Sequence, residues 1–428
     1  MIRPLILAWL VAFGSTWFSV VHEASAQSAP ANDPPANDPA AKDPAANDPA
    51  ANDPVVVDPS SGDAAPLFYE YDPPSTLKVP VTEVSRAKYP FVDVHNHQWQ
   101  MPTQDLAALM GEMDALNMAV MVNLSGRGAR RLQRPDGTFY FALGEDDFLA
   151  RVMGNVKQNG AGRILVFTNL DFSDIDAPGW TEAAVRRLEA DVEAGAVGLK
   201  IYKSLGFEKI GDQRVAVDDA RLDPIWAKCG ELGVPVLIHT GEPASFWHPK
   251  DGSNERLLEM IEKPERWRGK PGEYPSFEDL TAEQHRIFRR HPGTTFINAH
   301  LGWLGNDLGR LGDLLDELPN VYTEIGAVVA ELGRQPRFAR RFLIEHQDRV
   351  LFGKDTWTPS EYPLYFRILE SDDDYVKYFR QRHAFWRLYG LDLPDEVLRK
   401  IYYENALRLF PSLDRSLFAK VEGSPSAE

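Results

Sequence analysis

Short apolar runs alternate with longer amphipathic stretches from about residue 88 to residue 355. The apolar runs are rich in Val, Ile and Phe, which is typical of strands that are buried on both faces. Several amphipathic stretches end in helix-stop sequences such as Glu-Leu-Gly-Val-Pro. Alternating strands and helices of this number predict a parallel (β/α)8 TIM barrel. We expect its strands at residues 91–95, 118–123, 163–168, 196–201, 234–239, 294–300, 320–325 and 349–354.

The amphipathic stretches predict helices at residues 181–194, 219–232, 283–290 and 307–318. The alternation is interrupted after the fifth strand by a long segment, 243–277, which is rich in aromatic residues, Pro and Gly. Loops of this length are usually functional or disordered, and the aromatic content favours a lid over a pocket, with His248 as a candidate for substrate contact. Residues 360–418 are expected to form extra helices on the outside of the barrel.

Two histidines, His95 and His97, stand at the end of the first predicted strand. Side chains alternate along a strand, so residues spaced i, i+2 point to the same side and can chelate one divalent ion. His239, His300 and Asp355 end the fifth, sixth and eighth predicted strands. Active sites of such barrels form at the C-terminal ends of the strands, where these five residues would meet. Each histidine alone fits a buried structural role, but together they favour a site for zinc, manganese, iron or cobalt.

Two more titratable residues close strands of the same barrel. Lys200 ends the fourth strand, where it can bind a substrate carboxylate or pair with a nearby acid, and Glu324 ends the seventh as an acid partner. Four arginines after the second and seventh strands are candidates for binding an anionic substrate, although a solvated loop charge is favoured for each arginine alone: Arg127, Arg130, Arg131 and Arg334.

The net charge of −17 argues against non-specific binding of nucleic acid, which needs clustered Lys and Arg. The single cysteine, Cys229, excludes an intrachain disulfide. We therefore expect a small-molecule substrate as the main partner, no nucleic acid, and a homo-oligomer as an open possibility.

The first 26 residues have the pattern of a signal peptide. Arg3 precedes an apolar stretch from Leu5 to Val21, and Ala24-Ser25-Ala26 supplies a cleavage site. The pattern predicts Sec-type export to the periplasm or the extracellular space, with contact to a membrane only through this segment; an uncleaved anchor is the alternative. Residues 27–66 repeat Asp-Pro units and predict a disordered linker. The barrel domain is expected at 67–418 and a disordered tail at 419–428.

The motifs at the strand ends resemble those of the amidohydrolase superfamily, in particular the amidohydrolase-related branch that includes the aminocarboxymuconate semialdehyde decarboxylases. The matching segments are DVHNH at 93–97, GLK at 198–200, IHTGEP at 238–243, AHLG at 299–302, LFGKD at 351–355 and ENALRLF at 404–410. The resemblance implies that the metal ligands are His95, His97, His239 and Asp355.

The same resemblance leaves the number of metal ions open. In binuclear members the lysine matching Lys200 is carboxylated and bridges two ions, whereas the amidohydrolase-related branch is more often mononuclear. The histidine matching His300 binds a second ion in some branches and activates water or substrate in others. We expect one or two divalent ions, with zinc favoured, and catalytic roles for His300 and Asp355.

The signal-peptide pattern and the metal-site residues together predict an exported metal-dependent hydrolase. A metal-activated water would attack the carbonyl carbon of an amide, ester or lactone, and Asp355 would relay the proton. The alternative is a metal-dependent non-oxidative decarboxylase, a carbon–carbon lyase, that uses the same site. A third reading is an exported binding protein without catalytic activity.

Overall fold

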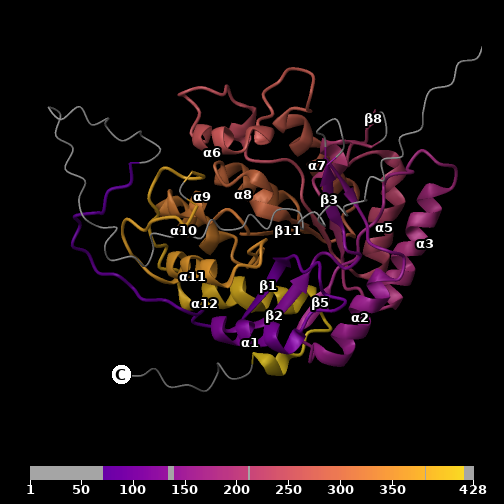
Figure 1. Ribbon diagram of the computed structural model, residues 1–428, viewed down its shortest axis with the longest axis horizontal. Coiled ribbons are helices and arrows are strands. Elements are labelled where there is room, and N and C mark those ends of the chain that lie inside the picture. Colours follow the sequence, from indigo (N-terminus) through magenta and orange to yellow (C-terminus); the bar gives the residue numbers. More distant parts are fainter. Residues whose placement is uncertain (1–70, 134–138, 211–212, 381, 419–428) are drawn as a thin grey trace, which may run out of the picture. The chain divides into compact units, whose positions relative to one another are not determined.

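The computed structural model describes residues 71–133, 139–210, 213–380 and 382–418 (Figure 1). The predicted signal peptide, the Asp-Pro linker and the tail at 419–428 lie outside the described residues. Among the helices of the described ranges, none combines the length and apolar character needed to cross a bilayer.

Eight parallel strands form the centre of the described part of the chain. Their order is β1-β2-β5 in one group and β6-β9-β10-β11-β12 in the other. A bridge between Thr168 and Leu199 joins the groups on one side, and the Val94 N–H donates to Phe352 O over 3.0 Å on the other. The ring therefore closes, which confirms the predicted barrel. The strands are β1 Phe91–Asn96, β2 Met118–Asn123, β5 Ile164–Val166, β6 Leu199–Ile201, β9 Val236–Ile238, β10 Phe296–Asn298, β11 Val321–Glu324 and β12 Val350–Leu351.

Helices follow the strands and cover the barrel, and α3 and α5 lie side by side (Figure 1). α7 begins earlier than predicted because Ser276 caps it: the Ser276 hydroxyl accepts from the Asp279 N–H over 3.0 Å, and Glu278 and Asp279 fill the first turn. The main helices are α1 Leu106–Leu116, α2 Phe148–Asn159, α3 Trp180–Glu193, α5 Asp223–Leu232, α7 Phe277–Arg290, α8 Leu308–Glu317, α9 Val329–Gly333, α10 Pro336–Glu345 and α11 Tyr362–Glu370.

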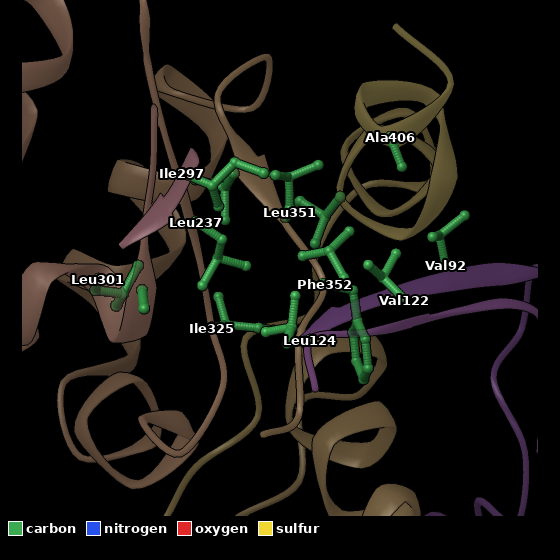
Figure 2. Packing of buried hydrophobic residues seen from close by; sticks show 14 of the residues in the cluster. Val92, Val122, Leu124, Leu237, Ile297, Leu301, Ile325, Leu351, Phe352 and Ala406 are labelled. Atoms are coloured by element: carbon green, nitrogen blue, oxygen red, sulfur yellow. The ribbon is translucent and has the colours of Figure 1, made fainter. Parts of the chain in front are cut away.

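The core lies between the strands and their helices. Figure 2 shows buried side chains of β1, β2, β9, β10 and β12, with Ala406 at one side of the group. Ala406 belongs to α13, Asn405–Leu409, which follows α12, Asp395–Arg399. The predicted extra helices after residue 360 therefore contribute to the core that holds the strands in place, because α13 and the helical turn before it contact β12.

The excursion after β9 is held together by its own aromatic residues. It contains the short helices η3 Ala244–Trp247, α6 Leu257–Glu262 and η4 Pro264–Arg266. The Trp247 indole N–H donates to Pro275 O over 2.8 Å, and the Trp267 indole N–H donates to His248 O over 3.0 Å. These aromatic side chains fix the shape of the excursion itself.

Two small hairpins were not predicted from the sequence. They are β3 Arg130–Gln133 with β4 Phe139–Ala142, and β7 Lys209–Ile210 with β8 Gln213–Arg214. Both lie in the loops that follow barrel strands, where short paired segments carry little periodic signal. The short helix α4, Ser204–Phe207, follows β6 and precedes the second hairpin.

Candidate metal centre

The C-terminal ends of the strands bring the predicted site residues together. His95 lies in β1, Lys200 in β6 and Glu324 at the end of β11. His239 comes directly after β9, whereas His300 and Asp355 lie in the loops that follow β10 and β12, beyond the strand ends at Asn298 and Leu351. One potential ligand atom from each of His95, His300 and Asp355 lies within 4.8 Å of the others.

The remaining two histidines border this group. The Asp355 Oδ1 atom lies 3.3 Å from His95 Nε2 and 3.8 Å from His97 Nε2. His300 Nε2 lies 3.3 Å from His239 Nδ1. Since the His95 and His300 ring centroids are 4.8 Å apart, all five predicted residues form one cluster.

A chain of hydrogen bonds fixes the proton on His97. The Tyr202 hydroxyl donates to Leu124 O over 3.2 Å, and a carbonyl can only accept. The Ser125 hydroxyl, 3.0 Å away, therefore donates to Tyr202, and it accepts from His97 Nδ1 over 2.7 Å. His97 Nε2 is left with its lone pair facing Asp355, and the ring stacks on the rings of Trp99 and Tyr202.

The protons on His300 and His239 follow from the same reasoning. His300 Nδ1 donates to Gly326 O over 2.8 Å, so its Nε2 accepts. An indole N–H can only donate, so His239 Nε2 accepts from Trp303 over 3.3 Å and His239 Nδ1 donates to His300. A metal ion held by His239 would replace one of these two hydrogen bonds.

Glu324 positions two of the histidines. It is fully buried, and its Oε1 accepts from His95 Nδ1 over 2.9 Å and from the His300 N–H over 2.6 Å. Burial alone would raise the pKa of this carboxyl. Its interactions with His95 and His300 have the larger effect and lower the pKa to about 2. Glu324 is therefore a carboxylate that directs His95 Nε2 toward the centre, an arrangement common around metal-binding histidines.

We expect Glu324→Gln to weaken metal binding by about 10- to 100-fold, because the amide no longer offers a charged acceptor to His95. The measurement is competition for the metal against a chelator, with the melting temperature as a check on folding. Glu370→Gln is the matched control, since Glu370 accepts from Tyr402 outside the centre. Equal metal affinity in the two variants would contradict the positioning role.

The backbone at the site is strained at two predicted residues. His300 has a φ of 58° and Asp355 a φ of 85°, a region that non-glycine residues rarely adopt. Such strain persists where the surrounding structure enforces it and is concentrated at functional sites. Here it aims both side chains at the His95 ring.

Burial keeps the imidazoles neutral and so ready to act as ligands. Desolvation lowers the pKa of His95 to about 4, and it lowers the pKa values of His97 and His239 well below their usual value. Burial raises the pKa of Asp355, but the neighbouring histidines and Lys200 lower it to a net value far below the ordinary range. Neutral imidazoles around one carboxylate are a donor set that fits a divalent transition metal.

Lys200 is buried inside this cluster. Its Nζ atom lies 3.4 Å from His95 Nε2 and 5.6 Å from the centroid of the Tyr202 ring. Desolvation lowers the pKa of Lys200 to about 8. The amine is therefore mainly a cation near pH 7 but loses its proton more readily than an ordinary lysine, which suits either a substrate-binding cation or, through its neutral form, a lysine that reacts with carbon dioxide.

Two of the arginines predicted to bind an anion, Arg127 and Arg334, form ion pairs with carboxylates of the protein instead. Arg127 is buried and makes two hydrogen bonds of 2.7 Å to Asp191. Arg334 pairs with Glu255 over 2.8 Å and with Glu331 over 2.7 Å. The side chains of Arg130 and Arg131 lie outside the described part of the structure.

Sequence reasoning missed Tyr202, Ser125 and Trp303. Tyr202 follows Lys200 by two residues, so the alternation of a strand could have placed both side chains on one side. Ser125 and Trp303 lie in loops after β2 and β10, where no period applies. Their roles depend on contacts across the barrel and were not readable from spacing.

A family model described as Amidohydrolase matches residues 92–412. No curated protein sequence matches the chain. Similar solved structures include 2,6-dihydroxybenzoate decarboxylase from Rhizobium, at 17% identity over 76% of this chain and 99% of that chain, with a TM-score of 0.44. A putative amidohydrolase from Staphylococcus aureus is 15% identical over 75% of this chain and 99% of that chain, with a TM-score of 0.47. 4-Oxalomesaconate hydratase from Rhodopseudomonas palustris is 16% identical over 78% and 99%, with a TM-score of 0.43. The matched segment contains the whole cluster of histidines and Asp355, and the chain belongs to the amidohydrolase family.

Proposed function

We propose that this protein is a metal-dependent hydrolase that adds water to the carbonyl carbon of an amide, ester or lactone. The observation that carries the proposal is that Asp355 lies among the histidines and is partly exposed. Its side chain is 31% exposed, whereas the Glu324 side chain is fully buried. Asp355 is thus the carboxylate of the cluster that can reach both a metal ligand set and an incoming substrate.

The ligand set that we propose is His95, His97, His239 and Asp355, with zinc as the favoured ion. A divalent ion bound there supplies Lewis acidity, which lowers the pKa of a water and polarises a carbonyl. The neutral imidazoles and the carboxylate suit zinc and also manganese. His95 and His97 already direct Nε2 toward Asp355, as ligands of one ion must.

The protein's own residues would move the proton. Asp355 is ionised, so it can accept a proton from the attacking water and deliver it to the leaving group. His300 presents the lone pair of Nε2, because Nδ1 is committed to Gly326 O. It can therefore accept a hydrogen bond from the second O–H of the attacking water and orient that water while Asp355 takes the first proton.

The second candidate is a non-oxidative decarboxylase that uses the same site. Lys200 favours it, because a buried cation beside His95 is a suitable partner for a substrate carboxylate. Product analysis separates the two reactions: release of carbon dioxide without addition of water indicates the lyase.

The experiment that tests the proposal begins with the metal. Protein purified without chelator should contain one or two equivalents of a divalent metal by elemental analysis, and chelation should abolish turnover of amide, ester and lactone substrates. Full activity in metal-free protein would overturn the proposal. Metal-dependent release of carbon dioxide from carboxylated substrates, with no hydrolysis, would replace it with the second candidate.

Lys200 is expected to set the number of metal ions. If Lys200 is carboxylated, Lys200→Ala should lose one metal equivalent, and short-chain carboxylic acids should partly restore it. If Lys200 binds substrate as a cation, the variant should keep its metal and show a raised KM. A variant unchanged in metal content and in KM would show that Lys200 is structural.

We also propose that the protein is exported through its N-terminal segment. The support is the sequence pattern alone: a positive start, an apolar stretch and an Ala-Ser-Ala cleavage site. N-terminal sequencing of the protein recovered outside the cytoplasm should begin at Gln27. Recovery of an uncleaved chain in membranes would indicate an anchor.

A further inference from the structure

A left-handed turn follows β10 and carries two of the side chains at the metal centre. His300, Leu301, Gly302 and Trp303 have φ angles of 58°, 55°, 62° and 56°. Four successive residues in this region are rare, because the conformation is costly for every residue except glycine. One helical turn takes three to four residues, so His300 and Trp303 lie on one face, and their ring centroids are 4.7 Å apart. The strained turn therefore places an indole, as well as His300, at the metal centre.

The indole of Trp303 donates to a histidine that would have to give a lone pair to a metal ion. The Trp303 N–H lies 3.3 Å from His239 Nε2, and an indole N–H can only donate. His239 Nδ1 then carries the proton of the ring and donates it to His300 Nε2 over 3.3 Å. In this state both nitrogens of His239 are engaged in hydrogen bonds.

Metal binding by His239 breaks the bond from Trp303 whichever nitrogen is the ligand. If Nε2 is the ligand, its lone pair is no longer available to the indole. If Nδ1 is the ligand, the ring proton moves to Nε2, and two N–H groups then face each other. In both cases the half-buried Trp303 N–H loses its acceptor beside the metal centre. A donor left unpaired in such a place is costly, so another acceptor would be bound preferentially.

The proposed reaction creates such an acceptor. When water adds to a carbonyl carbon, the carbonyl oxygen gains negative charge, and a donor fixed beside it stabilises the transition state more than the substrate. The other titratable groups that face the centre are mostly acceptors. Three histidines present lone pairs and two carboxylates are ionised: His95, His97, His300, Glu324 and Asp355. The freed indole N–H supplies a donor among these acceptors.

We propose that the Trp303 N–H has two acceptors in turn: His239 in the metal-free protein and, once a metal ion holds His239, the substrate oxygen that gains negative charge. The inference rests on the proposed function, because an oxygen of this kind arises when water adds to a carbonyl carbon. It makes Trp303 a catalytic residue, since its indole would touch the reacting group.

The first test follows the Trp303 N–H itself and needs no turnover. Full-length protein, isotope-labelled at the indole nitrogens of its ten tryptophans, is observed by NMR without metal, with zinc, and with zinc and methylphosphonate. The Trp303 proton signal, identified by its absence in Trp303→Phe, should move upfield with zinc, because its hydrogen bond to His239 is lost. It should move downfield with methylphosphonate, whose charged tetrahedral group resembles a carbonyl carbon under attack. The Trp247 signal should stay in place, because its indole donates to Pro275 O.

A Trp303 signal that does not move upfield with zinc would overturn the proposal. So would a signal that stays upfield in saturating methylphosphonate.

The second test uses the opposite signs that the proposal gives to two effects of Trp303→Phe. Zinc should bind about two- to ten-fold more tightly in competition with a chelator, because the ion no longer displaces a hydrogen bond. The kcat per bound metal should fall about 100-fold with little change in KM, because the lost donor acts in the transition state. Trp386→Phe is the matched control, since its indole donates to Ala330 O over 3.1 Å, and it should leave both values within two-fold. Weaker zinc binding together with slower turnover in Trp303→Phe would show a structural role and contradict the inference.

If Trp303→Phe fails to fold, His239→Ala identifies the signal instead, because removal of the acceptor should move the Trp303 resonance in metal-free protein. The two titrations then use the unaltered chain, and the same outcomes decide. The two proposals fail separately. The expected shifts of the Trp303 signal without metal-dependent turnover of any amide, ester or lactone remove the proposed function alone. Metal-dependent hydrolysis with an unchanged Trp303 signal removes this inference alone.

Discussion

Asp355→Asn should lower turnover per bound metal by roughly 10²- to 10⁴-fold, the usual contribution of a positioned acid–base group. The Asp355 carboxylate stands between His95 Nε2 and His97 Nε2 and has a pKa far below its ordinary range. An amide keeps the size of the side chain but can neither accept a proton nor carry a negative charge to a metal.

The measurement is turnover normalised to metal content, with a melting curve for each protein. Glu361→Gln is the control, because Glu361 is also a carboxylate close to this loop but pairs with Lys354. The control should keep most of its turnover per metal. Turnover per metal in Asp355→Asn close to that of the parent protein would remove Asp355 from the mechanism.

The second large effect is expected at His300. His300→Ala should retain the metal and the fold while turnover falls about 100- to 1,000-fold, the usual result of removing one preorganised group that stabilises the transition state. His239→Ala should lose metal and turnover together, because a proposed ligand is gone. The two rings lie 4.5 Å apart between centroids, so the comparison keeps the surroundings nearly constant.

The structure adds a reason to compare His300 with His239 directly. His300, and not His239, lies with His95 and Asp355 in the group of closely spaced ligand atoms. If His300→Ala loses a metal equivalent while His239→Ala keeps its metal, the division of roles is wrong. A centre in which His300 holds an ion, with Lys200 as the bridge, would then explain the data better. Metal content and turnover measured on both variants side by side decide between the two.

The positions of the barrel strands were predictable because both faces of a barrel strand are buried. The apolar runs ending near His95, His239 and His300 had to be strands of a parallel sheet, and strand direction alone placed their last residues at one end. The observed strands β9 and β10 are shorter than predicted at both ends. At His300 the chain enters a left-handed turn, which no local pattern announced.

The sequence by itself therefore determined the barrel and the set of residues that could meet at its C-terminal end. It could not determine the state of each residue, because proton positions depend on partners from distant strands. The proton of His97 is positioned by Ser125, which is itself bonded to Tyr202. The proton of His95 is positioned by Glu324, and that of His239 by Trp303. Arg127 and Arg334 looked available for substrate, but tertiary contacts pair them with Asp191 and with Glu255 and Glu331. Only the folded chain decides this, because the energy of a charge depends on which groups surround it after burial.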